Sequence, residues 1–311
     1  MKKGRYAPVV VFAYKRVDKL MKCIDSLTAA DLHEKTEVYI YADGAKGKED
    51  EEDVGKVRRY LKDILKNHDF GELKVVERNR NVGLANNVIS GVSEVIHGHN
   101  RIIAVEDDLI VAGDFLDYIN KALDYYETEK NVWSVTGFSE PLGALKKYKH
   151  DVYYGYRGCS YGWGTWKDRW ESVDWEVKDY SLLLSSRELQ KHFNRGGNDM
   201  TGMLINQMEG RIDSWAIRWC FAQSMQNKYT VYPVSSFIVN DGVDGTGTNQ
   251  HKGEAIRYNM HEYGEQMIFE KLKPDKRITR DFYYAHSDTL AKKIKRNIPV
   301  LNKKRQIDPK K

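Results

Sequence analysis

The sequence lacks the features that define several large protein classes. Its 311 residues include only 6 prolines and 3 cysteines, and no apolar run reaches the ~20 residues of a membrane-spanning helix. Cys23, Cys159 and Cys220 form no CxxC pair, which suits a reducing cytosol better than a disulfide scaffold. The longest candidate for a signal-peptide core, residues 9–13, is too short. The expected location is therefore cytoplasmic.

Two nucleotide-binding motifs are also absent. No GxxxxGK(S/T) phosphate loop occurs and no GxGxxG follows the first apolar run, which argues against a P-loop NTPase and a dinucleotide dehydrogenase. The overall charge of +5 conceals an acidic body: residues 271–311 hold 14 Lys and Arg against 4 Asp and Glu, a local +10, which leaves −5 for residues 1–270. Nucleic-acid enzymes usually carry positive charge over their working surface, so no nucleic-acid partner is expected.

Short apolar runs alternate with amphipathic stretches over residues 1–140. The content of 41% hydrophobic and 12% aromatic residues excludes a disordered chain. Strands are predicted at residues 8–13, 38–41, 73–76, 101–105 and 132–136, with helical apolar spacing in residues 20–27, 54–65, 85–96 and 115–126. This pattern predicts an α/β fold, with a Rossmann-like, mainly parallel sheet flanked by helices. No inter-domain linker is visible, so we expect a single domain with a basic C-terminal tail.

Ligands of an open parallel sheet bind at the carboxyl ends of its strands, and three acids stand at one such end. Glu106, Asp107 and Asp108 close an apolar run, where their mutual repulsion and desolvation cost several kcal/mol unless a positive charge compensates them. Oxygen ligands suit Mn²⁺ or Mg²⁺. A crystal soaked with manganese and nucleotide in which a neighbouring Arg or Lys still held these acids would contradict the interpretation, and a hydrated acidic loop is the alternative.

An ordered set of short motifs resembles one enzyme family. The set comprises Val9–Tyr14 with Arg16, Tyr41–Gly44, Asn81–Leu84, Val105–Asp108, Gly162–Trp166, Asp213–Trp215, Asn240–Gly242 and Gly245–Thr248. It resembles nucleotide-sugar glycosyltransferases of the type A fold, and more narrowly the bacterial polysaccharide-synthesis enzymes related to N-acetylglucosaminyltransferase I. The resemblance implies a catalytic domain over residues 1–270, with a nucleotide-sugar-binding half (1–140) and an acceptor-binding half (141–270). The basic extension, residues 271–311, lies outside it.

The resemblance also implies roles for single residues. Asp43, Asn81 and Gly83 would lie around the nucleoside, and the backbone at Ala13 and Tyr14 would support the base. Asp108 would bind the metal ion directly, while Glu106 and Asp107 contact ribose or water. Arg16 would offer a fork to phosphate, and pairing with an acid is the competing interpretation.

Asp213 is the candidate base for an inverting transfer. Such a transfer needs a group that takes the proton from the acceptor hydroxyl. Related enzymes carry the base in an Asp-Asp-Trp context, which residues 212–215 match in part because Ile212 replaces one acid. The alternative is that Asp213 caps the helix predicted to begin near Trp215.

Three further residues are candidates for sugar binding. Trp163 and Trp166 stand among glycines and could present aromatic faces to a sugar ring, although core packing is equally expected of tryptophan. Asp241 opens a polar, Gly-rich run to Asn249 whose amides could close over a diphosphate. His251 follows this run, and an exposed side chain is favoured there over a metal ligand.

The basic tail carries apolar residues at near-helical spacing from Leu290 to Leu301, among many Lys and Arg. Such a segment can lie on an anionic membrane, as a peripheral contact at the inner face of the plasma membrane, and a solvated tail is an equal alternative.

Together these features predict a metal-dependent inverting glycosyltransferase. It would move a hexosyl or N-acetylhexosaminyl group from a nucleotide sugar, with a UDP-sugar as the favoured donor. The acceptor would be a hydroxyl of a glycan or lipid-linked glycan in polysaccharide or lipopolysaccharide synthesis. The alternatives are a sugar nucleotidylyltransferase, whose basic Gly-rich signature is missing after the first strand, and a non-enzymatic carbohydrate-binding protein, which leaves the strand-end acids without a purpose.

Overall fold

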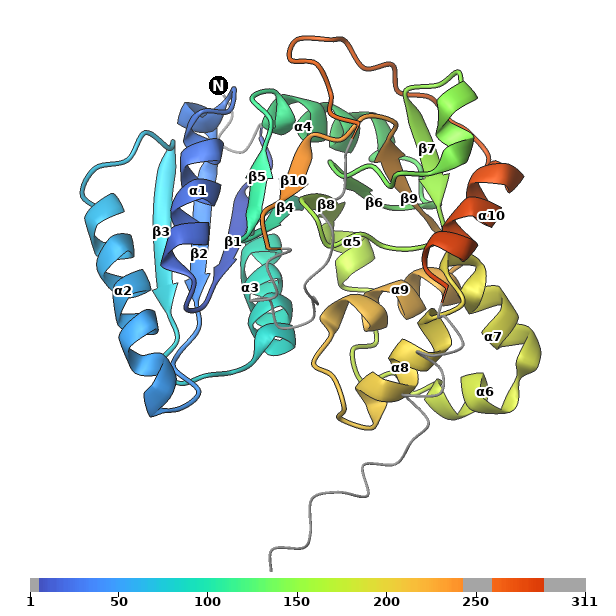
Figure 1. Ribbon diagram of the computed structural model, residues 1–311, viewed down its shortest axis with the longest axis horizontal. Helices are drawn as coiled ribbons and strands as arrows, with labels where there is room; N and C mark the ends of the chain where they lie inside the picture. The colour runs from blue at the N-terminus through green and yellow to red at the C-terminus, as the bar shows by residue number, and fades with distance from the viewer. Residues whose placement is uncertain (1–5, 243–258, 288–311) are drawn as a thin grey trace, which may run out of the picture.

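The computed structural model describes residues 6–242 and 259–287, and its centre is one eight-stranded sheet (Figure 1). The strands are β1 Val9–Ala13, β2 Glu37–Ala42, β3 Glu72–Glu77, β4 Arg101–Glu106, β6 Val132–Thr136, β7 Val152–Gly155, β8 Trp163–Trp166 and β9 Tyr229–Pro233, in the order β3-β2-β1-β4-β8-β6-β9-β7. Only β8 and β7 run antiparallel to their neighbours. The predicted α/β fold with a mainly parallel sheet is confirmed.

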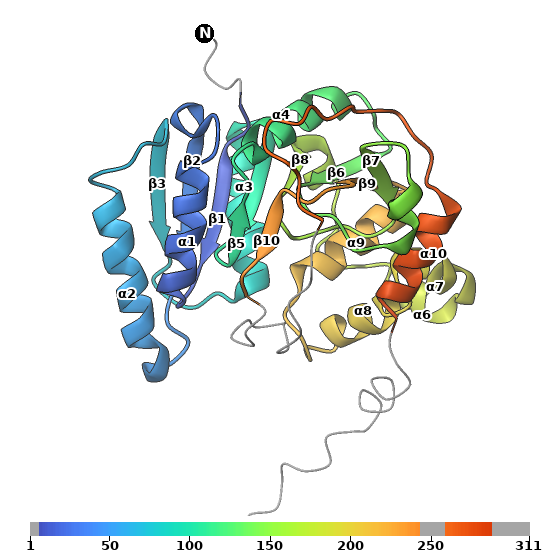
Figure 2. The same ribbon diagram turned by 45° about the horizontal axis from the view of Figure 1, so that its top comes forward.

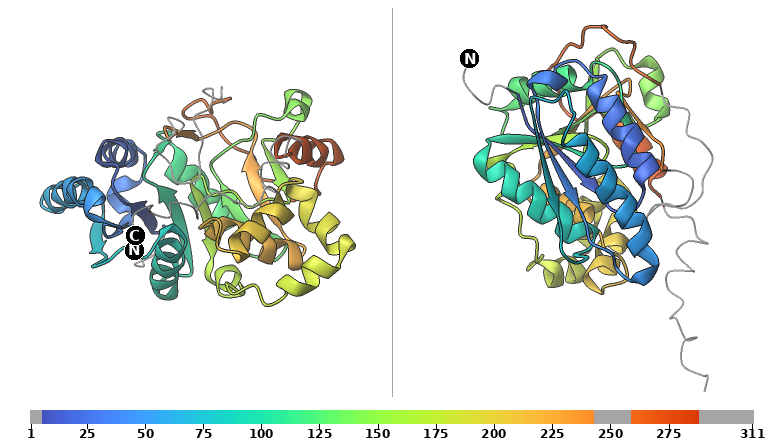
Figure 3. Two further views of the ribbon diagram at one scale, coloured as in Figure 1. Left: turned by 60° about the horizontal axis from the view of Figure 1, so that its bottom comes forward. Right: turned by 90° about the vertical axis from the view of Figure 1, so that its left-hand side faces the viewer.

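Helices cover both faces of this sheet (Figure 3). The α-helices are α1 Val17–Thr28, α2 Lys48–Ile64, α3 Leu84–Gly98, α4 Phe115–Tyr126, α5 Lys167–Trp170, α6 Tyr180–Ser185, α7 Arg187–Phe193, α8 Met200–Met208, α9 Trp215–Met225 and α10 Lys276–Ala285. Short 3₁₀ turns occupy His33–Lys35, Gly143–Lys147 and Asn194–Gly196. The buried apolar residues of α1, α2 and α4 pack with one face, while those of α3 and α9 pack with the other.

The strands and helices predicted in the first 140 residues are all present. In contrast, β7 and β8 lie in the Gly-, Tyr- and Trp-rich stretch for which no strand was predicted. β8 joins β4 to β6, and β7 pairs with β9 at the far edge, so one sheet continues through both predicted halves. The boundary at residue 140 stays a prediction.

A small second sheet forms beside the carboxyl end of β4. It pairs β5, Leu109–Val111, with β10, Ile238–Asn240, in antiparallel register (Figure 2). Because only Asp107 and Asp108 separate β4 from β5, the pairing holds the acidic residues against the end of β10. The main-chain N–H of Asp241 donates to the carbonyl oxygen of Asp108 at 2.8 Å.

The C-terminal part of the described chain is a docked helix. Ile278 and Phe282 of α10 are each 1% exposed and pack on Tyr153 of β7 and Tyr232 of β9. The amphipathic segment from Leu290 to Leu301, the Gly-rich residues 243–249 and His251 lie outside the described residues, so the predictions on them stay predictions. Within the described part of the chain, no helix is long and apolar enough to cross a membrane.

Candidate active site

A cavity of about 850 Å³ lies where the carboxyl ends of β1, β2 and β4 meet the helices of the second half. This volume is within the usual range for small-ligand sites. Of the residues predicted as functional, those that line it are Ala13, Tyr14, Arg16, Asp43, Asn81, Gly83, Glu106, Asp107, Asp108 and Asp213. Trp163, Trp166 and Asp241 do not. Stretches of sequence up to 200 residues apart (13 to 213) therefore meet around one hollow.

Asp43 organises one wall of the cavity. It ends β2 and is 4% exposed, and its carboxylate accepts four hydrogen bonds. The donors are the main-chain N–H groups of Gly44 and Val82, both at 2.9 Å, and the N–H of Gly83 and the amide of Asn81, both at 3.1 Å. Asp43 thus fixes the loop before α3, and with it the residues predicted to surround the nucleoside.

Gly83 is required by the geometry of this loop. It precedes α3 with φ +83°, a conformation that favours glycine, and a Cβ there would lie 2.9 Å from Oδ2 of Asp213. The loop and the candidate base therefore touch each other.

Tyr14 belongs to a second cluster of polar residues, at the end of β1. Its hydroxyl donates to Asp50 Oδ2 at 2.6 Å and accepts the main-chain N–H of Lys46 at 3.1 Å. Lys15 pairs with the other oxygen of Asp50 at 2.5 Å. Burial, followed by the hydrogen bond to Asp50, raises the pKa of Tyr14 to about 12, so its proton stays in place. The group ties the segment after β1 to the start of α2.

Arg16 faces the acidic residues at the end of β4. Its guanidinium forms ion pairs with both Asp107 and Asp108, the second at 2.9 Å between Nη1 and Oδ2. The chain without ligands thus shows the alternative interpretation, in which Arg16 pairs with an acid, but its partners are two buried residues of the metal motif instead of a surface acid. Contact of Arg16 with phosphate stays a prediction.

One guanidinium does not balance three carboxylates. Asp107 and Asp108 are 4% and 6% exposed. Burial, with Asp108 and Asp107 adding to it and Arg16 opposing, raises the pKa of Glu106 to about 8. Burial also raises the pKa of Asp107 to about 6 although Arg16 lowers it. Positive charge is still deficient here, as it is in sites that receive a cation.

The donor set of this corner fits a divalent cation with oxygen ligands. No group of three or more His, Cys, Asp and Glu within residues 6–242 and 259–287 is arranged to hold a metal ion. Mg²⁺-type ions, however, are usually held by one or two carboxylates together with substrate phosphates. Asp107 and Asp108 supply two carboxylates on the cavity wall. A Cβ on Gly242 would lie 2.2 Å from Asp108 Oδ2, so only glycine fits beside this oxygen, which Arg16 contacts in the chain without ligands.

Asp213 lies on the cavity wall between α8 and α9. Its Oδ2 accepts the main-chain N–H of Ala85, in the first turn of α3, at 3.2 Å. Its Oδ1 has no hydrogen-bond donor among the described residues. The cap of α9 is Ser214, whose Oγ accepts the N–H of Ile217 at 3.4 Å. The alternative that Asp213 caps this helix is therefore wrong, and Asp213 is one of the residues that line the cavity.

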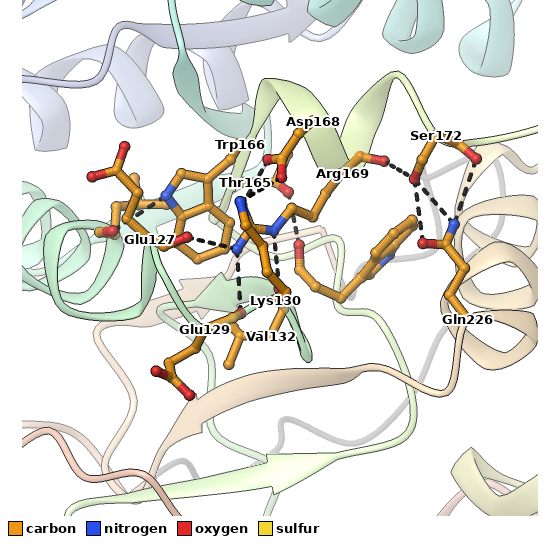
Figure 4. Close-up of polar contacts among 12 residues, drawn as sticks. Glu127, Glu129, Lys130, Val132, Thr165, Trp166, Asp168, Arg169, Ser172 and Gln226 are labelled. Carbon is orange, nitrogen blue, oxygen red and sulfur yellow. Dashed lines mark hydrogen bonds and ion pairs between the residues drawn. The ribbon is translucent and has the colours of Figure 1, made fainter.

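Trp163 and Trp166 belong to the core. They are 1% and 2% exposed, so neither indole has a free face for a sugar, and the predicted platform role is corrected in favour of core packing. Trp166 donates from its ring nitrogen to the carbonyl oxygen of Leu123 and lies 4.4 Å below the guanidinium of Arg169. Figure 4 shows this arginine reaching the main-chain oxygens of residues 127, 129 and 132. Another tryptophan, Trp215, lines the cavity.

Asp241 faces α1 and does not line the cavity. Its carboxylate pairs with Lys22 at 2.8 Å and with Lys19 at 3.1 Å. The hydrogen bond from Lys22, together with Lys19, lowers its pKa. The two lysines satisfy this carboxylate, so a direct substrate contact of Asp241 is not supported.

The far end of the cavity contains residues that sequence reasoning missed. Glu140 follows β6, Arg157 follows β7 and His286 follows α10. Nε2 of His286 lies 3.0 Å from Oε1 of Glu140. These two residues stand 146 positions apart, and neither lies in a recognisable motif, so no local signal indicated that they meet.

Residues 2–174, more than half of the chain, match the GNT-I family. The chain therefore belongs to this family, and the resemblance found in the sequence motifs is confirmed.

One curated relative is the alpha-1,3-mannosyl-glycoprotein 2-beta-N-acetylglucosaminyltransferase of Arabidopsis thaliana, 25% identical over 188 residues. The match covers 55% of this chain, and the chain spans only 41% of that relative.

Two solved structures are similar at low scores. One is the mannosyltransferase PcManGT from Pyrobaculum calidifontis in complex with GDP-Man and Mn²⁺, with 14% identity, a TM-score of 0.36, and coverage of 54% of this chain and 47% of that chain. The other is TarS from S. aureus, with 10% identity, a TM-score of 0.39, and coverage of 76% and 37%. Because both TM-scores are below 0.5, the family assignment depends on the sequence match.

Proposed function

We propose that this protein is an inverting, metal-dependent glycosyltransferase. It transfers a sugar from a nucleotide sugar, with UDP as the first nucleotide to test, to a hydroxyl of a glycan. The observation that carries the proposal is that five of the eight motifs, those with Ala13, Asp43, Asn81, Asp108 and Asp213, line the same cavity although they are far apart in the sequence.

The donor occupies the end of the cavity formed by the early strands. The nucleoside lies against the loop held by Asp43, near Asn81 and Gly83, and the segment at Ala13 and Tyr14 supports its base. Both walls are fixed before the ligand arrives by hydrogen bonds within the chain, so little ordering is needed on binding.

The diphosphate lies toward the acidic corner. Asp108 and Asp107 would hold Mn²⁺ or Mg²⁺ there, with Arg16 released to the phosphate oxygens or to Glu106. When bound, such an ion neutralises negative charge on the leaving diphosphate. Arg16 in the ligand-free chain would therefore hold the acids in place until the divalent cation that accompanies the donor supplies the positive charge.

The acceptor hydroxyl gives its proton to Asp213. Oδ2 is held by the N–H of Ala85, which orients the carboxylate, and Oδ1 is left to take the proton. The hydroxyl oxygen then attacks the anomeric carbon from the face opposite the diphosphate, and the bond from that carbon to the diphosphate oxygen breaks.

N-acetylglucosamine is the first sugar to test, because the curated relative carries an N-acetylglucosaminyltransferase name. A thermal-shift screen of UDP-GlcNAc, UDP-Gal, UDP-Glc and GDP-Man with Mn²⁺ tests the donor. A ligand at ~100 times its dissociation constant stabilises the fold by about 2.7 kcal/mol. Stabilisation by no nucleotide sugar would contradict the proposal. Pyrophosphate release from a nucleoside triphosphate would indicate a nucleotidylyltransferase instead.

The acceptor would be a glycan or lipid-linked glycan of cell-surface polysaccharide or lipopolysaccharide synthesis, made at the cytoplasmic face of the membrane. Charge supports this part of the proposal, since residues 271–311 carry a local +10. Co-sedimentation with anionic liposomes, with and without residues 288–311, tests it. Equal sedimentation of both chains would contradict a membrane contact.

A further inference from the structure

The cavity extends well beyond the donor end. Its far part is bounded by Glu140 after β6, Arg157 after β7, Met203 and Asn206 on α8, and His286 after α10. These elements belong to the opposite half of the sheet from β1 and β2, since β9 and β7 end the strand order (Figures 1 and 2). A molecule that filled this part would approach a donor bound at the early strands from the other side.

The charged groups in this part stand in pairs. Nε2 of His286 lies 3.0 Å from Oε1 of Glu140, and Arg157 makes a bidentate pair with Asp199 at 2.9 and 3.1 Å. Asp199 offsets the guanidinium of Arg157, and the imidazole of His286 carries a positive charge only when it is protonated, so the pairs leave no surplus of positive charge. The region therefore offers an anionic ligand no net attraction, while the charged groups remain strong hydrogen-bonding partners for hydroxyls.

Glu140 keeps one acceptor for a ligand. Oε1 faces His286, while Oε2 has no donor among the described residues. The side chain is 15% exposed and lines the cavity, so a ligand hydroxyl could reach this oxygen and donate a hydrogen bond to it. Tyr161, which lines the same part of the cavity, adds an aromatic surface of the kind that suits sugar rings.

His286 is held in place by α10. The helix is anchored by the burial of Ile278 and Phe282, and by Asp281, which accepts the N–H of Ala144 at 2.8 Å. A Cβ on Gly197 would lie 2.7 Å from Cβ of His286, so the end of the helix is closely packed. Because the family match ends at residue 174, α10 adds to the cavity a wall from outside the matched region.

We propose that Glu140 and His286 form an acceptor subsite for an uncharged hexose or N-acetylhexosamine unit. Glu140 accepts a hydrogen bond from a sugar hydroxyl, and His286 holds the carboxylate in the orientation that allows it. This subsite rests on the proposed transferase function, and it selects the acceptor rather than the donor.

Retention of immobilised glycans, with UDP and Mn²⁺ present, tests the subsite. The probes are glycans that end in an uncharged hexose or N-acetylhexosamine and matched glycans that end in a uronic acid. Glu140→Gln and His286→Gln should each lower retention of the uncharged set at least tenfold. Their dissociation constants for UDP, measured by calorimetry, should stay within twofold of the unmodified chain.

The His150–Glu270 pair supplies a matched control. Its imidazole and carboxylate lie 2.6 Å apart and do not line the cavity, so His150→Gln and Glu270→Gln should leave retention unchanged. A misfolded Glu140→Gln chain would lose UDP binding as well, and His286→Gln then gives an independent result from another element.

The outcomes separate the two proposals. Three results would each overturn the subsite. They are unchanged retention of glycans by both cavity variants, a preference for glycans that end in a uronic acid, and no retention by a chain that binds UDP. Retention of uncharged glycans by a chain that does not bind UDP would keep the subsite and reject the donor function.

Discussion

Two acidic turns, at the ends of the strands on either side of β1, behave very differently. Asp43, after β2, is a single buried carboxylate with four hydrogen-bond donors from its own chain. Residues 106–108, after β4, are three carboxylates opposed by the guanidinium of Arg16. The first turn is complete without a ligand, whereas the second has a deficit of positive charge. The contrast distinguishes Asp43, which holds the loop of the site in place, from residues 106–108, which are available to bind a ligand.

Replacing Asp108 should have the largest of the expected effects, a loss of transfer activity. Asp108→Asn removes a carboxylate from the charge-deficient turn, so transfer should fall by about 10³-fold or more, equivalent to several kcal/mol of lost transition-state stabilisation. EDTA should do the same to the unmodified chain. Turnover assays with added Mn²⁺ test this. Asp117→Asn, on an exposed pair with Lys121, is the control, and activity of Asp108→Asn near that control would contradict the metal role.

Asp213→Asn should lower transfer by about 10²–10⁴-fold, the usual contribution of a general base. The affinity for UDP should stay within twofold, because the amide oxygen can still accept the N–H of Ala85. Turnover and calorimetry on the same sample measure the two quantities, with Asp117→Asn again as control. Retained turnover would remove Asp213 from the mechanism.

Asp43→Ala should act on stability rather than on chemistry alone. It leaves the buried donors around residues 44 and 81–83 unsatisfied, and we expect the free energy of unfolding to drop by about 2–3 kcal/mol. Urea unfolding measures this drop. Asp53→Ala, on the exposed surface of α2, should change stability by less than about 0.5 kcal/mol. Equal stability of the two variants would show that the hydrogen bonds of Asp43 contribute nothing net.

Arg16→Gln should have the smallest of the expected effects. It tests directly whether the turn after β4 has a deficit of positive charge. Without the guanidinium the three acids repel one another, so the free energy of unfolding should fall by about 1–2 kcal/mol. Mn²⁺ should then raise the melting temperature more in this variant than in the unmodified chain, because the metal no longer competes with Arg16. Lys56→Gln, on an exposed pair, should respond to Mn²⁺ like the unmodified chain. An equal response of Arg16→Gln would argue against a cation in this corner.

The sequence could predict those parts of the fold that depend on local patterns. The strands β1 to β4 are short apolar runs bounded by turn residues, and their ends supplied the residues that line the donor end of the cavity. In contrast, β8 was missed because Gly164 between Trp163 and Trp166 suggested a loop. The structure buries this strand between partners on both sides, an arrangement that depends on residues far away in the sequence.

The sequence did not indicate which distant residues form ion pairs with the side chains of the site. Arg16 meets Asp107 across 91 positions, and Asp241 meets Lys19 and Lys22 across more than 200. Similarly, the burial of Trp166 follows from its packing with α4, which no spacing within residues 162–166 reveals. Motifs identify the residues near a ligand, whereas ion pairs between separate segments decide which of them are free to bind it.

The contact between Asp213 and the first turn of α3 has a consequence for the kinetics. The loop before α3 is predicted to touch the nucleoside, and the N–H of Ala85 at its end positions the carboxylate that would deprotonate the second substrate. One loop therefore serves both subsites, and hydrogen bonds within the chain fix it before either ligand arrives. A substitution that loosens this loop, such as Asp43→Ala, should thus raise the dissociation constant for the nucleotide and lower turnover in the same variant.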